Sequence, residues 1–207
     1  MVTENIKHTI SFLKDKFLIE SEDKKFQYRY EHTQRVAAIG QQIAVKEGMN
    51  EEALVIGCLL HDIGYIECST EEDYDLHGRI SARIAREFLE SIQYDEDWIQ
   101  TICYGIYIHT EEKPQKDPTP FESSIADADN IDRFDAYRLY ENLKYSAIEK
   151  MQQEEIATLS LKRIARLDEL RDYYFGTETG REMWMDKLAF QKAYYERLLS
   201  QMELTLF

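Results

Sequence analysis

The sequence predicts an all-α protein, and we expect its 207 residues to form a single helical domain. Only 3 Pro and 8 Gly interrupt the chain, so most segments contain no helix breaker. Within these segments, apolar residues recur at the three- and four-residue spacings that define one face of a helix. A chain of this length can bury about 70% of its unfolded surface, which is enough for a core without disulfides or structural metals.

Six helices are expected in the first two thirds of the chain. Their approximate ranges are 5–20, 28 or 30 to 48, 51 to 61–64, 76–92, 95–109 and 120 to beyond 135. The third is apolar on every side from Ala53 to Leu60, which is typical of a helix in the middle of a core. We expect Gly64 to end it. The expected connections include a polar segment at 21–25, an acidic loop at 67–75 and a loop with two prolines at 110–119.

Beyond Tyr140 the pattern remains helical to Met202, with a break near 176–180. This last third is rich in Tyr and Leu and contains no histidine. We interpret it as packing, as a cover over the functional site or as an oligomer surface, so a homodimer is one arrangement kept open. Within the single domain 1–207, we expect 138–207 to be a C-terminal helical extension packed on the rest.

The charge and the cysteines exclude several classes of protein. A net charge of −15 argues against a surface that coats nucleic-acid polymers or anionic membranes, because both need exposed Lys and Arg. Three cysteines without a CxxC spacing indicate neither a disulfide framework nor a zinc knuckle. The N-terminus lacks a signal-peptide pattern, and the longest apolar run is too short to span a bilayer. We therefore expect a cytoplasmic protein.

Four of the five histidines lie on or beside apolar helical faces. His32 shares a face with Val36, while His77 and His109 stand at helical spacing from apolar residues, and His61 closes the buried third helix. One histidine on an apolar face is usually a core residue with its own partners, but four on separate helices predict converging imidazoles. Converging neutral imidazoles with carboxylates form a site for divalent transition metals.

The carboxylates of such a site are only partly specified by spacing. Asp62 follows His61 directly, and its two oxygens can bridge two cations. A second carboxylate is expected from the segment 124–132, which offers Asp127, Asp129 and Asp132. Two residues apart on a helix, Asp127 and Asp129 point to nearly opposite sides, whereas Asp129 and Asp132 share a side. Spacing alone does not choose among them.

This ordered set of residues resembles the HD-domain superfamily of metal-dependent phosphohydrolases. The pattern is a lone histidine, then His-Asp after a buried helix, then a distant aspartate in a helix rich in Ala and Asp. It is carried here by Tyr30–Thr33, Leu59–Gly64 and Ala126–Asp129. The resemblance covers about 28–137, which becomes the expected metal-binding core, and implies a helical HD-domain bundle. The context Arg29–Thr33 is similar to the branch containing symmetrical diadenosine tetraphosphate hydrolases.

The resemblance also implies two metal sites. The residues that match the first site are His32, His61, Asp62 and Asp129. A dinuclear subset of the family adds two further histidines, matched by His77 and His109, with Asp62 as the bridge. The implied cofactor is a divalent transition metal, two ions of Fe, Mn, Co, Ni or Zn, because mixed His and carboxylate ligation suits them better than Ca.

The chain departs from the family at two positions where many members carry Lys or Arg. It has Tyr65 after the Asp-Ile-Gly segment and Asn130 after the last ligand aspartate. The nearby basic alternatives for a phosphate contact are Arg29, Arg133, Lys113 and Lys116. Of these we assign Arg29, together with Asp62, a catalytic role.

The site and the resemblance together predict a metal-dependent enzyme that hydrolyses a phosphoric ester or anhydride, a phosphohydrolase or phosphodiesterase, through a metal-bound hydroxide. A small phosphorylated substrate, a nucleotide or nucleotide-like phosphoester, is expected because relatives act on such compounds. The main alternative on the same ligands is a dinuclear-iron HD-type oxygenase. A non-catalytic nucleotide-binding regulatory module ranks third, because such modules usually lose ligands and all six positions are filled here.

Overall fold

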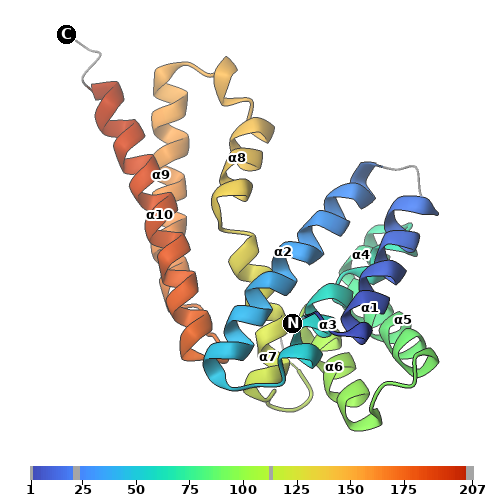
Figure 1. Cartoon of the computed structure of the whole chain (residues 1–207). Helices are drawn as coiled ribbons and strands as arrows, with labels where there is room; N and C mark the ends of the chain where they lie inside the picture. Colours follow the sequence, from blue (N-terminus) through green and yellow to red (C-terminus); the bar gives the residue numbers. More distant parts are fainter. Residues whose placement is uncertain (1, 21–23, 112–113, 204–207) are drawn as a thin grey trace. The chain divides into compact units, whose positions relative to one another are not determined.

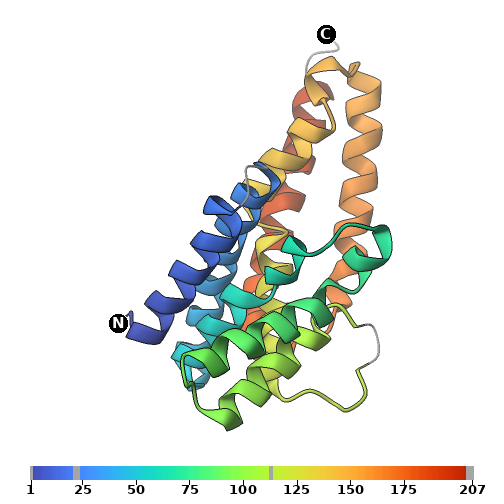
Figure 2. The same ribbon diagram turned by 90° about the vertical axis from the view of Figure 1, so that its right-hand side faces the viewer.

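The computed structural model describes residues 2–20, 24–111 and 114–203. These ranges are helical, with short 3-10 and π turns between the α-helices and without a strand, so the predicted all-α class is confirmed (Figures 1 and 2). The α-helices are α1 Glu4–Lys14, α2 Lys24–Glu47, α3 Glu51–Leu60, α4 Glu71–Asp75, α5 His77–Ser91, α6 Glu96–Ile108, α7 Pro120–Asp132, α8 Ala136–Tyr145, α9 Gln153–Glu169 and α10 Glu178–Glu203.

The chain divides into two compact units. The first comprises Met1–Asp132 together with Phe175–Gly180, and the second comprises Arg133–Tyr174 and Arg181–Phe207. The boundary after Asp132 lies close to the end of the expected core at 137. The expectation of one domain, with 138–207 packed on 28–137, stays a prediction.

The first unit is built around α3. All eight residues from Ala53 to Leu60 are buried, as expected for a helix that is apolar on every side. Helices α1, α2, α6 and α7 all contact α3, and α5 packs on α6. Because α3 leads straight into His61 and Asp62, the centre of the core and the His-Asp pair are adjacent.

Local sequence signals fix where these helices begin and end. The Asn50 side chain accepts a hydrogen bond from the Ala53 amide at the start of α3, an N-cap that satisfies a free helix donor. At the start of α7, the Glu122 carboxylate accepts from the Thr119 amide, and the Thr119 hydroxyl accepts from the Glu122 amide. Gly48 follows α2 with a φ of 67°, the left-handed conformation expected after a helix end.

Several expected boundaries are wrong. Helix α2 begins at Lys24, before Tyr28, and the expected acidic loop contains α4. Five residues suffice for α4 because Thr70 and Asp73 form a capping box. Most of the polar connection at 21–25 lies outside the described residues.

The sixth helix was expected to pass Asp135, but α7 ends at Asp132. Asp135 adopts an extended conformation, and its side chain accepts a hydrogen bond from the Ala136 amide, so it begins α8 instead of continuing α7. Gly64 does not end α3, which stops at Leu60, and a 3-10 turn at Ile63–Ile66 runs through this glycine.

The second unit has its own small core around Trp184. This ring is 2% exposed, packs against Phe134 at 4.6 Å between centroids, and donates its Nε1 hydrogen to the Leu170 carbonyl at 3.0 Å. Lys192 of α10 pairs with Asp168 of α9 at 2.6 Å. Aromatic packing and these pairs therefore join α10 to the segments before it.

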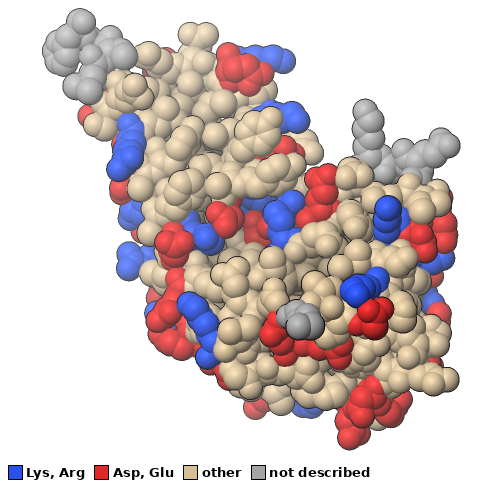
Figure 3. Space-filling view, viewed as in Figure 1, with Lys and Arg blue, Asp and Glu red and all other residues tan. Residues whose placement is uncertain are grey.

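Among the described residues, no helix combines the length and apolar character that crossing a membrane requires. On the face drawn in Figure 3, acidic and basic side chains are interspersed, and no continuous basic patch appears among the described residues.

Candidate metal centre

The six residues expected as ligands come from five segments of the first unit. His32 is on α2, His61 and Asp62 follow α3, His77 begins α5, His109 caps the end of α6, and Asp129 is on α7. The structure brings all six together, whereas His8, the fifth histidine, is exposed on α1. Their role as metal ligands stays a prediction, but the convergence of the imidazoles is a feature of the structure.

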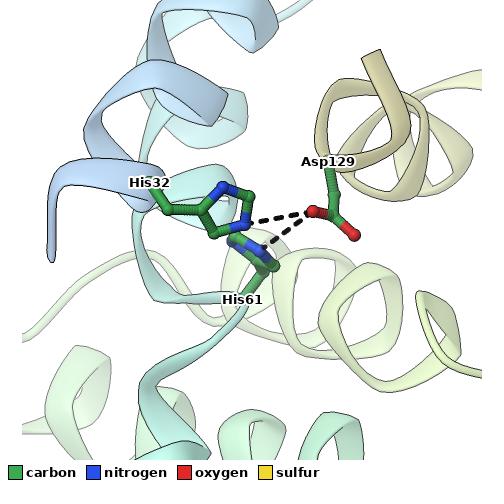
Figure 4. A group of neighbouring side chains, drawn as sticks. All are labelled: His32, His61 and Asp129. Atoms are coloured by element: carbon green, nitrogen blue, oxygen red, sulfur yellow. Dashed lines mark ion pairs between the residues drawn. The ribbon is translucent and has the colours of Figure 1, made fainter. Parts of the chain in front are cut away.

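One side of the cluster consists of His32, His61 and Asp129 (Figure 4). The Nε2 atoms of His32 and His61 lie 3.1 Å and 3.9 Å from Asp129 Oδ1. Their ligand atoms all lie within 4.8 Å of one another, so one ion could contact all three. Asp129, the carboxylate of α7 that the resemblance implies as a ligand, therefore lies near both histidines.

The other side of the cluster centres on Asp62 Oδ1. The Nε2 atoms that surround this oxygen belong to His77 at 3.4 Å, His61 at 3.5 Å and His109 at 3.8 Å. The second oxygen, Oδ2, lies 3.6 Å from His32 Nε2. The oxygens of Asp62 thus face opposite sides of the cluster, an arrangement in which one carboxylate could contact two ions. The two candidate groups share His61, but an imidazole Nε2 has one lone pair, so Asp62 is better suited to contact two ions.

Backbone carbonyls fix the tautomers of three of the histidines. The Nδ1 atoms of His61, His77 and His109 lie 2.7, 2.6 and 2.5 Å from the carbonyl oxygens of Cys58, Tyr74 and Ile106. Because a carbonyl oxygen can only accept, each Nδ1 carries a hydrogen, and in the neutral ring the Nε2 atom then presents a lone pair to the cluster. This is the arrangement in which histidine binds a metal.

A metal ion would supply the partner that the Nε2 lone pairs lack among the described residues. His61 Nε2 is buried and has no hydrogen-bond partner within the described residues. The Nε2 atoms of His77 and His109 face each other at 3.2 Å, and in neutral rings protonated at Nδ1 neither has a hydrogen to donate. Two nitrogens bound to one ion, each at about 2.1 Å, lie at about this spacing. The donor set therefore fits a divalent transition metal.

Burial and the neighbouring charges shift the pKa values of the cluster. Burial lowers the pKa of His61 to about 4, against the attraction of Asp62, so this imidazole is neutral. Burial raises the pKa of Asp129, but hydrogen bonding to His32 and the proximity of His61 outweigh it and hold this pKa below its usual value. The pKa of Asp62 is also held low, because nearby histidines and Arg29 outweigh burial. Anionic carboxylates and a neutral imidazole are the forms that bind metals.

Asp132 orients His32, a role that the sequence interpretation missed. Its Oδ2 accepts the Nδ1 hydrogen of His32 at 2.7 Å, and Arg35 donates to both oxygens at 2.8 and 3.1 Å. Asp132 is 4% exposed, so this network lies inside the protein. The sequence did contain a signal for this role, because Asp129 and Asp132 share one side of the helix. Two carboxylates on that side can contact the two ring nitrogens of one histidine, here Nε2 and Nδ1 of His32.

Asp127 accepts its hydrogen bond from a backbone amide instead of a histidine. It is buried, and its Oδ2 accepts a hydrogen bond at 2.9 Å from the amide of Gly176, in the segment Phe175–Gly180. A Cβ at Gly176 would come within 2.5 Å of the Ser123 side chain, so only glycine allows this approach without a shift. Asp127 therefore anchors a distant segment of the chain beside α7.

Arg29 is the basic residue that reaches the cluster. Its Nη1 donates to Asp62 Oδ2 at 2.7 Å, and its guanidinium carbon lies 3.6 Å from the centroid of the Tyr65 ring. Burial works against the charge of Arg29, but Asp62 and Tyr65 outweigh it and raise the pKa, so the guanidinium stays protonated.

Of the other basic candidates, Lys116 is the one described within the first unit. Lys116 pairs with Glu122 at 3.1 Å and lies 4.2 Å over the Tyr104 ring, which makes it part of the loop before α7. Arg133 belongs to the second unit. Lys113 lies outside the described residues.

Comparison with known families decides the relationship of this chain. The family model of the HD domain matches residues 29–136, more than half of the chain. The chain belongs to the HD domain family. This confirms the resemblance, and the match includes all six residues of the cluster. HD domains are metal-dependent hydrolases, in agreement with the donor set found here.

Two individual proteins resemble this HD domain protein. An uncharacterized protein of Clostridium beijerinckii is 30% identical over 126 residues, which cover 60% of this chain and 76% of the relative. The crystal structure of a predicted HD superfamily hydrolase from an uncultured Thermotogales bacterium matches with a TM-score of 0.67 and 20% identity, over 95% of this chain and 92% of that chain. At 20% identity, the match to this crystal structure supports the fold alone.

Proposed function

We propose that this protein is a metal-dependent phosphohydrolase or phosphodiesterase that acts on a nucleotide or nucleotide-like phosphoester. One observation carries the proposal: imidazole Nε2 lone pairs and two carboxylates converge in a buried cluster beside a protonated arginine. Hydrolysis of a phosphoester needs both parts, a place for metal ions and a positive charge near the phosphoryl oxygens.

The residues divide into two proposed metal sites. His32, His61, Asp62 and Asp129 would hold the first ion, and Asp62, His77 and His109 would hold the second. Bound divalent ions of Fe, Mn, Co, Ni or Zn would lower the pKa of water towards neutral and offset charge on the phosphoryl group.

Arg29 and Asp62 have the proposed catalytic roles. Asp62 would contribute to both proposed sites, because its two oxygens face different histidines. Within the described residues, Arg29 makes one hydrogen bond, to Asp62, so its remaining N–H groups can donate to a phosphoryl oxygen. The nucleotide part of the proposal rests on what relatives of this family hydrolyse.

A screen of phosphomonoesters, phosphodiesters and nucleotides tests the proposal, with metal-free protein reloaded separately with each of the five metals. We expect phosphate or nucleotide release without oxygen, and about two ions per chain by elemental analysis. Oxygen consumption with the iron-loaded protein, without anaerobic hydrolysis, would instead indicate an oxygenase. Tight nucleotide binding without turnover in either assay would indicate a regulatory module.

A matched pair of arginines tests the role of Arg29. Arg79 also has a carboxylate partner, Glu111, and lies 5.5 Å over the Tyr107 ring, but its side chain is 54% exposed. We expect Arg29→Gln to lower kcat/KM by about 10- to 1000-fold, the loss of charge-assisted contacts to the phosphoryl group. Arg79→Gln should leave kcat/KM within about twofold. Equal effects of the two substitutions would exclude a specific role for Arg29.

A further inference from the structure

Tyr65 contacts both a basic residue and a candidate ligand of the cluster. The guanidinium carbon of Arg29 is 3.6 Å from the centroid of its ring. The His77 ring is 4.5 Å away between centroids, inclined by 44°. The ring of Tyr65 thus contacts both the arginine and a candidate ligand of the second metal site.

The turn that carries Tyr65 is tightly fixed. The Gly64 amide donates to the Ser81 hydroxyl on α5 at 2.8 Å. A Cβ on Gly64 would lie 2.6 Å from the His77 carbonyl oxygen and 2.7 Å from the Ser81 amide nitrogen, so only glycine permits this approach. The close contact with α5 holds the neighbouring residue, Tyr65, beside His77.

The guanidinium of Arg29 needs such a support. An arginine side chain has several rotatable bonds, and Arg29 is held at its tip by one hydrogen bond, to an oxygen of Asp62 that a metal ion would also use. A flat ring under the guanidinium restricts its plane and attracts its charge.

We infer that Tyr65 is a positioning residue, whose ring holds the Arg29 guanidinium so that its unpaired N–H groups face the phosphoryl group of the substrate. The inference rests on the proposed function. It explains how a chain with tyrosine after the Asp-Ile-Gly segment keeps a positive charge at the cluster. Arg29 on α2 supplies the positive charge, and the ring of Tyr65 supplies the surface against which its guanidinium lies.

Four variants separate the ring from its hydroxyl and from general damage. Tyr65→Phe keeps the ring, Tyr65→Leu removes it, and Arg29→Gln removes the cation. Tyr104→Leu is the matched control, because Tyr104 also lies under a cation, Lys116 at 4.2 Å, away from the cluster.

In the reloaded protein, we expect Tyr65→Leu to raise both KM and the inhibition constant of inorganic phosphate by about 5- to 30-fold, the effect of losing one desolvated cation–π contact. Tyr65→Phe and Tyr104→Leu should leave both within about twofold. In the Arg29→Gln background, Tyr65→Leu should have no further effect. A loss of kcat in Tyr65→Phe would overturn the inference, because the hydroxyl would then be what matters. Loss of a metal ion from Tyr65→Leu would overturn it too, because the ring would then support His77.

A measurement without metal or substrate keeps the inference separate from the proposed function. In ¹⁵N-labelled metal-free protein, the side-chain Nε–Hε signal of Arg29 can be assigned by its absence in Arg29→Gln. The ring current of Tyr65 should displace this signal, and the displacement should persist in Tyr65→Phe and disappear in Tyr65→Leu. An unchanged signal in Tyr65→Leu would overturn the positioning role. Absence of phosphoester turnover in the wild type would overturn the proposed function alone.

Discussion

Replacing Asp132 by Asn should weaken metal binding although Asp132 does not face the candidate metal position. The substitution keeps the shape of the side chain but removes the negative charge that holds the Nδ1 hydrogen of His32 at 2.7 Å. It also leaves at most one of the two Asp132 acceptors for the guanidinium of Arg35. Without the carboxylate, the ring of His32 is less basic and freer to rotate.

The expected size follows from this contact. Losing the partner of a ligand histidine typically lowers metal affinity by about 10- to 100-fold. This corresponds to about 1.4 to 2.8 kcal/mol, comparable to one charge-assisted hydrogen bond. Because Asp132 is 4% exposed, solvent cannot replace the lost acceptor, and we expect the upper part of this range.

Titration calorimetry with Mn²⁺ on metal-free protein measures the affinity directly. The matched control is Asp127→Asn, a second buried carboxylate on α7, whose partner is the Gly176 amide instead of a histidine. The control should change the unfolding midpoint but leave the Mn²⁺ dissociation constant within about threefold. An unchanged affinity in Asp132→Asn, or an equal loss in both variants, would refute an orienting role for Asp132.

Three further outcomes are expected. His77→Ala and His109→Ala should each lower the metal content from about two ions per chain to about one, and unchanged content by elemental analysis would show that the second site is wrongly assigned. Gly64→Ala should lower the free energy of unfolding in urea by about 1 to 3 kcal/mol, because the added Cβ meets the backbone of His77 and Ser81, and an unchanged midpoint would contradict this crowding. Chelation should lower the melting temperature by several degrees, and re-addition of metal should restore it. A free metal concentration about 100 times the dissociation constant of one site stabilises the folded protein by about 2.7 kcal/mol.

The helical pattern was sufficient to predict the core and the meeting of the histidines. A segment that is apolar on every side has to be buried, and α3 is buried along its whole body from Ala53 to Leu60. Histidines on the inner faces of the helices packed around α3 must then lie close together. The six candidate ligands were therefore predictable as a group from periodicity and resemblance.

The details of α7 could not be predicted from periodicity. Asp129 and Asp132 lie on the same side of the helix, and only the position of His32 decides that one faces Nε2 and the other Nδ1. The partner of Asp127 lies 49 residues further along the chain, beyond any local pattern. The end of α7 was not predicted because the helical pattern continues through Asp135. In the structure, Asp135 is instead the N-cap of α8.

The segment Phe175–Gly180 gives the unit that carries the cluster an order of assembly. It belongs to this unit although the residues on both sides of it belong to the other. During synthesis, Asp127 emerges from the ribosome well before Gly176, so its carboxylate waits for a partner while about fifty more residues are added. The helix that carries Asp129 can therefore acquire its last native contacts only after most of the second unit has been translated.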